Sequence, residues 1–131
     1  MAKLIHTMIR VRDLDASLKF YQDVLNLTPA HMLDFPDFTL AYLRNVENDV
    51  ELELTLNKGR QEPYTHGDGY GHVAVVVDDV AATHAELVRQ GYAPLAVKEF
   101  KVGDDLLARF FFIQDPDGYK IEVLERHGHY H

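Results

Sequence analysis

The 131-residue sequence contains no cysteine and a single serine, Ser17. Without cysteine the chain cannot form a disulfide bond, a thiolate nucleophile or a cysteine-ligated zinc site. A serine hydrolase would have to use Ser17, and the residues around it do not resemble a nucleophile elbow. These absences exclude thiol chemistry and argue against a serine nucleophile.

Positive charge and long hydrophobic runs are also scarce. The sequence has 13 Lys and Arg against 21 Asp and Glu, and its net charge of −8 disfavours nucleic acids and anionic membranes as partners. The longest apolar runs, 73–77 and 110–113, are far shorter than the ~18 residues of a membrane span. The N-terminus lacks the continuous apolar segment of a secretion signal, so we expect a cytoplasmic protein.

The sequence repeats itself at a nearly constant spacing. His6 and the residues after it align with His72 and its successors at an offset of 66, and Glu53 aligns with Glu122 at an offset of 69. The chain has about the length of one domain. We therefore expect a single domain, 1–131, built from two modules that span 1–60 and 69–131, with the loop-like stretch 58–71 at their boundary.

Each module is predicted to contain one helix and several strands. The sequence pattern indicates strands at 3–11, 38–45, 49–57, 72–77, 108–114 and 119–125, the last two forming a hairpin around a DPDG turn. Each module follows the pattern βαβββ, which predicts an α+β fold with antiparallel strands and the helices on one side.

The two helices are predicted from apolar residues at helical spacing. The faces that we expect to be buried consist of Leu14, Leu18, Tyr21 and Leu25 in the first helix and of Val80, His84, Leu87 and Val88 in the second. Asp13 or Asp15 is a candidate N-cap of the first helix. Gly91 is a candidate end of the second.

Successive side chains of a strand point to opposite faces, so the repeated His and Glu residues can be assigned to one face of each strand. His6 and His72 lie opposite the aliphatic residues of their strands, and so do Glu53 and Glu122; Glu51 shares the face of Glu53 and is its alternative. Two imidazoles and two carboxylates suit divalent nickel, cobalt, iron or zinc. Four protein ligands in an octahedron leave two positions open, as catalysis at a metal requires.

The aromatic residues and the remaining histidines of the two modules are expected to have mainly structural roles. The aromatic side chains indicate core, interface or the wall of a pocket, and they include Phe35, Phe38, Tyr42 and Phe110 to Phe112. His31, His66 and His84 have no counterpart in the other module, so we expect them to be structural or exposed.

Five segments together resemble glyoxalase I of the vicinal oxygen chelate superfamily. The segments are HTMIRVRD (6–13), FYQDVLNL (20–27), ELTLNKG (53–59), GYGHVAVVVDD (69–79) and DPDGYKIEVLE (115–125). The resemblance implies mixed, curled sheets with the helices on their outer face. It also implies that His6, Glu53, His72 and Glu122 are the metal ligands.

The resemblance further implies the reaction. Glyoxalase I isomerises the hemithioacetal of glutathione and methylglyoxal to S-lactoylglutathione by proton transfer through a metal-bound enediolate, a detoxification of methylglyoxal. Glu122 matches the catalytic base, and Glu53 is the mirror carboxylate that serves the other substrate face. Short bacterial members prefer nickel or cobalt over zinc, so Ni²⁺ is the expected metal. Members are homodimers whose metal sites take one His–Glu pair from each subunit.

Glutathione-binding positions carry over only in part. Arg10 and Asn57 match substrate-binding residues of the family, and Lys101 or Arg109 is the candidate partner of the glycyl carboxylate. Asp68 stands where animal members have a basic residue, which puts the identity of the thiol in doubt.

Three other functions remain open on the residues alone. An extradiol-type dioxygenase uses two His and one carboxylate on iron(II), and Glu53 disfavours it because the second carboxylate stands where such a site has His. An epimerase of coenzyme A thioesters would use a similar metal site. A drug-binding resistance module without enzymatic activity commonly lacks the metal ligands.

Overall fold

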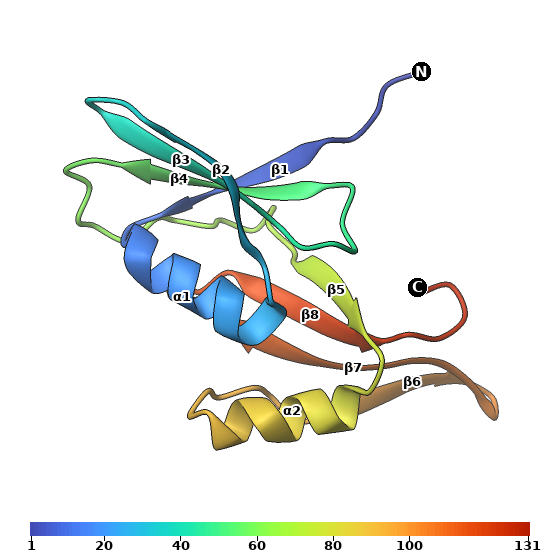
Figure 1. Cartoon of the computed structure of the whole chain (residues 1–131). Coiled ribbons are helices and arrows are strands. Elements are labelled where there is room, and N and C mark those ends of the chain that lie inside the picture. The colour runs from blue at the N-terminus through green and yellow to red at the C-terminus, as the bar shows by residue number, and fades with distance from the viewer. The chain divides into compact units, whose positions relative to one another are not determined.

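Two βαβββ units follow one another along the chain in the computed structural model, which describes all 131 residues. Unit 1 comprises Met1–Thr65 and unit 2 comprises His66–His131. Figure 1 shows one helix and one four-stranded sheet in each unit. The predicted α+β class and the βαβββ pattern are confirmed. Neither helix is long and apolar enough to cross a membrane.

The two units have the same order of elements. Unit 1 consists of β1 (His6–Val11), α1 (Leu14–Leu25), β2 (Thr28–Asp34), β3 (Phe38–Arg44) and β4 (Glu51–Asn57). Unit 2 consists of β5 (Val73–Val77), α2 (Val80–Arg89), β6 (Lys98–Val102), β7 (Asp105–Gln114) and β8 (Lys120–Glu125).

The sheets are mixed and have equivalent strand orders, β1-β4-β3-β2 in unit 1 and β5-β8-β7-β6 in unit 2. β1 pairs with β4 in parallel and β5 with β8 in parallel, whereas the remaining neighbours are antiparallel. The antiparallel pairing predicted from the βαβββ pattern is therefore wrong for the first strand of each unit, whereas the mixed sheets that the resemblance implies are confirmed. Parallel neighbours need a long crossover connection, which the helix and the following hairpin provide. The predicted β7–β8 hairpin is confirmed.

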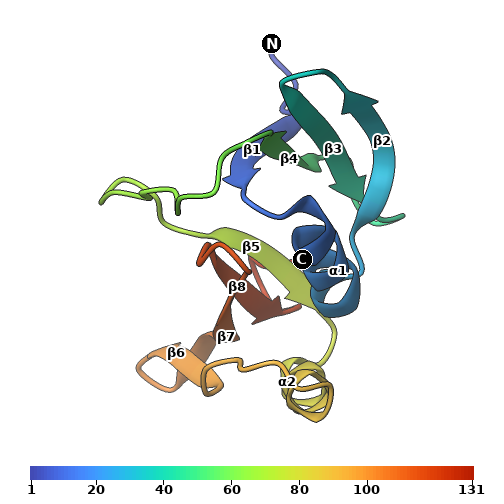
Figure 2. The ribbon, with the colours of Figure 1, turned by 90° about the vertical axis from the view of Figure 1, so that its left-hand side faces the viewer.

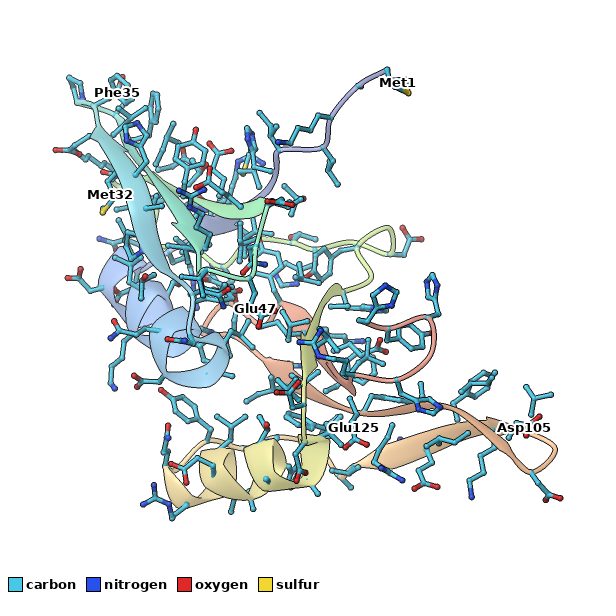
Figure 3. All side chains as sticks on the ribbon, turned by 45° about the vertical axis from the view of Figure 1, so that its right-hand side comes forward. Met1, Met32, Phe35, Glu47, Asp105 and Glu125 are labelled. Atoms are coloured by element: carbon cyan, nitrogen blue, oxygen red, sulfur yellow. The ribbon has the colours of Figure 1, made fainter.

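The strands β2 and β6 lie outside the predicted ranges. Both are edge strands, and every residue in them is exposed. A strand with no buried face shows no alternation of apolar and polar residues, so the sequence carries no signal for it. In β2 the pairing with β3 also shifts between Pro29 and His31, as proline favours at a sheet edge. Figure 3 marks the β2–β3 hairpin by Met32 and Phe35 and the β6–β7 hairpin by Asp105.

Equivalent aspartates begin the two helices. The side chain of Asp13 accepts a hydrogen bond from the Ala16 amide at 3.0 Å, and that of Asp79 accepts one from the Ala82 amide at 2.9 Å. Asp13 rather than Asp15 is thus the cap of α1. After α2, Gly91 adopts φ +91°, a left-handed conformation that ends a helix at little cost for glycine.

We expect Asp13→Ala to lower the free energy of unfolding by about 1 kcal/mol, because the variant leaves a helix amide without its cap. Asp79→Ala should have an effect of the same size. Urea denaturation followed by circular dichroism measures both. Asp15→Ala is the control, since Asp15 caps nothing; an equal loss in that variant would contradict the capping role.

The buried helix face agrees with the prediction in α2, where Val80 and Leu87 are buried, and differs from it in α1. In α1 the buried residues are Ser17, Phe20, Tyr21 and Val24. Leu14, Leu18 and Leu25 are only half-buried, and in α2 Val88 is 53% exposed. The spacing allowed a face rotated by one residue, because apolar side chains stand on both. Burial of Ser17 also removes the chain's one serine from solvent. Figure 2 views α2 almost along its axis.

Candidate functional site

The first His–Glu pair joins β1 to β4. The Nε2 atom of His6 lies 3.3 Å from Oε2 of Glu53. In the parallel register Met8 stands opposite Glu53 and His6 opposite Glu51, so the pair is diagonal across the two strands. Ile9, Leu52 and Leu54 are buried on the other face of these strands. The two polar side chains therefore meet on the face that the helix does not cover.

The second pair repeats this arrangement between β5 and β8. The Nε2 atom of His72 lies 3.9 Å from Oε1 of Glu122. Ala74 stands opposite Glu122 in the parallel register, just as Met8 stands opposite Glu53. Each unit thus places one imidazole and one carboxylate in the same cross-strand relation. This holds although the two residues are 47 positions apart in unit 1 and 50 positions apart in unit 2.

The structure separates Glu53 from its alternative, Glu51. The carboxylate of Glu51 lies 3.8 Å from Nε of Arg44, a residue of β3. Glu53 is 8% exposed and faces His6 directly. Of the two carboxylates, the structure therefore pairs Glu53 with His6 and Glu51 with Arg44.

Within each unit the donor set is one nitrogen and one oxygen. Neither unit gathers three or more His, Asp or Glu side chains that could hold a metal. An imidazole and a carboxylate are donors that divalent transition metals accept. Each pair therefore supplies one nitrogen and one oxygen donor of the kind that such an ion accepts.

Tyr42 is a site residue that the sequence did not single out. Its hydroxyl donates a hydrogen bond to Oε1 of Glu53 at 2.9 Å. This hydrogen bond to the carboxylate raises the pKa of the Tyr42 hydroxyl above its usual value, so the hydroxyl stays a donor. In unit 2 the equivalent place on β7 is taken by Phe112, which stands opposite Glu122 as Tyr42 stands opposite Glu53.

Two of the predicted substrate-binding residues lie in unit 1, on the same face as His6. Arg10 follows His6 by four residues on β1 and stands opposite Thr55, and Asn57 lies two residues further along β4. The Asn57 amide donates to the Tyr64 hydroxyl at 3.1 Å. A cation and an amide therefore flank the first His–Glu pair on one side.

Lys101 lies in unit 2 on the exposed strand β6. Its ammonium is 3.3 Å from Glu99, an exposed ion pair of the kind that contributes little. Arg109, the alternative to Lys101, contacts Glu99 and also Glu125, whose other carboxylate oxygen accepts from the Val80 amide. Figure 3 shows Glu125 at the end of β8. Arg109 thus ties β6, β7 and β8 together.

The three histidines without a counterpart are held by other contacts. His31 stacks near Tyr42, His66 stacks on Tyr119 at 4.0 Å between ring centroids, and Nε2 of His84 lies 2.9 Å from the Leu95 carbonyl oxygen. His84 and His66 therefore have packing roles.

Unit 2 contains a pocket of about 600 Å³ next to the second pair. Its lining includes Phe112, Leu95, Gln114 and Lys120. The ring of Phe112 meets the His72 imidazole edge to face, with 5.4 Å between the ring centroids. Phe112 thus lines the pocket and also contacts His72.

Comparisons with known proteins identify the family of the chain. Residues 3–123 match the family model described as Glyoxalase/Bleomycin resistance protein/Dioxygenase superfamily. The chain is 44% identical over 129 residues to a lactoylglutathione lyase of Haemophilus influenzae, across 94% of this chain and 92% of that protein. It is 42% identical over 130 residues to a probable lactoylglutathione lyase of Synechocystis, across 93% and 94%.

Solved structures give the same result. The fold matches glyoxalase I from Zea mays with a TM-score of 0.83 at 30% identity, over 96% of this chain and 45% of that one. It matches the trypanothione-dependent glyoxalase I of Leishmania major with a TM-score of 0.76 at 34% identity, over 95% and 87%. With its doubled βαβββ architecture and its match over residues 3–123, the chain belongs to the Glyoxalase/Bleomycin resistance protein/Dioxygenase superfamily.

Proposed function

We propose that this protein is a glyoxalase I, a lyase that isomerises the hemithioacetal of methylglyoxal and glutathione to S-lactoylglutathione. The relatives named lactoylglutathione lyase, similar over more than nine-tenths of the chain, support this assignment. The structural observation that carries it is the duplicated His–Glu pair, with the same cross-strand geometry in both units.

The proposed metal ligands are His6, Glu53, His72 and Glu122. Two carboxylates balance the charge of a divalent ion, and two imidazoles favour nickel, with cobalt or zinc as alternatives. A bound metal would supply Lewis-acid stabilisation of the negative charge that develops on the two neighbouring substrate oxygens. As a further part of the proposal, the protein is a cytoplasmic homodimer in which each site takes one pair from each subunit.

The proton transfer is assigned to Glu122. Its carboxylate would remove the proton from C1 of the substrate and return it to C2, acting first as base and then as conjugate acid. The carboxylate of Glu122 lies 3.9 Å from His72, whereas that of Glu53 lies 3.3 Å from His6. The looser contact of Glu122 favours it over Glu53 as the residue that carries the proton. Glu53 would then be the mirror carboxylate that faces the opposite side of the substrate.

The remaining residues are assigned to the thiol part of the substrate. Arg10 would pair with a carboxylate of glutathione and Asn57 would hydrogen-bond to its backbone, because both flank the first His–Glu pair. Lys101 is the candidate for the glycyl carboxylate. Phe112, in the pocket beside His72, offers an apolar wall for the methyl group of methylglyoxal.

Metal reconstitution tests the proposal. We expect the metal-free chain to form no thioester from methylglyoxal and glutathione, and added Ni²⁺ to restore more activity than Zn²⁺, as followed by thioester absorbance. His129→Gln/His131→Gln, which removes exposed tail histidines, is the control against adventitious metal and should keep full activity. Inactivity with nickel, cobalt and zinc alike would defeat the assignment. Oxygen uptake with iron(II) and a catechol would instead identify a dioxygenase.

A further inference from the structure

The third strand of each sheet places an aromatic ring against the His–Glu pair. Tyr42 stands opposite Glu53 and Phe112 stands opposite Glu122 in the antiparallel register. The Tyr42 ring meets His6 edge to face at 5.5 Å and 70°, and the Phe112 ring meets His72 at 5.4 Å and 80°. The duplication therefore reproduces the ring, its partner and its angle in both units.

The two rings differ by one hydroxyl. In unit 1 that hydroxyl donates to Oε1 of Glu53 at 2.9 Å, while Oε2 of the same carboxylate faces His6 at 3.3 Å. Both oxygens of Glu53 thus have an assigned direction. In unit 2 the phenyl ring of Phe112 has no donor, and the carboxylate of Glu122 is met only by His72, at 3.9 Å.

The position of the hydroxyl is itself constrained. On the side of the ring away from Glu53, His31 of β2 stacks on Tyr42 with 6.0 Å between the ring centroids and 28° between their planes. The ring is therefore held by His6 at its edge and by His31 on β2. A hydrogen bond from a ring held in this way fixes the carboxylate rotamer, because moving Glu53 would break the bond and leave a half-buried hydroxyl without a partner.

We infer that the Tyr42 hydroxyl is a positioning group that holds Glu53 in the orientation of a permanent metal ligand. The consequence is that the two halves of the duplicated site are unequal. Glu122, beside Phe112, keeps the freedom to reorient that a proton carrier needs. This inference rests on the proposed function, because it takes Glu53 as a ligand.

Tyr42→Phe tests it, since the variant removes one oxygen atom and makes β3 match β7 at this place. We expect the dissociation constant for Ni²⁺, measured by competition with a chromophoric chelator, to rise about tenfold, as is typical when a partner of a metal ligand is lost. The visible absorption bands of the Co²⁺-loaded protein should change as well. Thr39→Val is the matched control: it removes a hydroxyl that donates to a carboxylate, Asp34 at 2.7 Å, from the same strand, and should leave both readouts unchanged.

The reciprocal variant Phe112→Tyr offers Glu122 a hydroxyl. We expect it to lower kcat several-fold without weakening Ni²⁺ binding. Unchanged Ni²⁺ affinity and an unchanged Co²⁺ spectrum in Tyr42→Phe would overturn the inference, and so would an equal loss of affinity in Thr39→Val. A parent protein that binds Ni²⁺ tightly but forms no thioester would overturn the proposed function alone, because the affinity comparison needs no turnover.

Discussion

Replacing Glu122 with glutamine is expected to lower kcat for thioester formation by roughly 10³-fold, within the range that general acid–base catalysis contributes. Glutamine has the size of glutamate and keeps an oxygen that can face His72, but its amide cannot accept the proton from C1. Steady-state kinetics on the nickel-loaded protein measure the loss. The oligomeric state should stay the same as in the parent, and the metal content of the variant is measured alongside, because glutamine is a weaker metal ligand than glutamate.

Glu125→Gln is the matched control for that experiment. Glu125 lies on the same strand, three residues beyond Glu122, and its carboxylate binds Arg109 and the Val80 amide instead of a histidine. We expect this variant to lose some stability and to keep its turnover. A Glu122→Gln protein with full activity would contradict the assigned base and redirect attention to Glu53.

Phe111→Ala is expected to destabilise the protein by about 3–5 kcal/mol. The Phe111 side chain is fully buried, and its ring meets His84 of α2 edge to face at 5.2 Å. Truncation leaves a cavity between the sheet and the helix of unit 2, which rigid neighbours cannot fill. Chemical denaturation at a fixed protein concentration measures the change in the free energy of unfolding.

Phe100→Ala provides the comparison, because Phe100 is 57% exposed on the edge strand β6. A surface truncation away from caps and networks changes stability by about 0.5 kcal/mol or less. Similar losses in the two variants would mean that the core of unit 2 does not lie between β7 and α2.

The positions that the sequence predicted well are those with a repeated local signal. Side-chain alternation and the 66- and 69-residue offsets pointed to His6, Glu53, His72 and Glu122, and the structure brings each histidine to its glutamate. That these four residues bind a metal stays a prediction. The cap of the first helix could be narrowed to Asp13 or Asp15 from the sequence, since a cap depends on residues within one turn of it.

The features that escaped prediction depend on which strands are neighbours. Tyr42 reaches Glu53 only because β3 lies beside β4, and strand order is not written in any local pattern. The strand β2 lacked a buried face, so its residues gave no periodicity. In α1 the predicted buried face was wrong because apolar residues stand on two neighbouring faces of the helix, one that includes Leu18 and one that includes Val24. Which of the two is buried depends on how the helix packs against the sheet.

The parallel pairing of β1 with β4 and of β5 with β8 has an evolutionary consequence. Glu53 follows His6 by 47 residues and Glu122 follows His72 by 50, yet each couple meets in the same way. An insertion between the paired strands therefore leaves the His–Glu contact in place, because it lengthens only the connection between them. A single-residue deletion inside β4 or β8 would instead turn the acidic group toward the interior, because successive side chains of a strand point to opposite faces. The length of these two strands is therefore constrained in a way that the length of the connections is not.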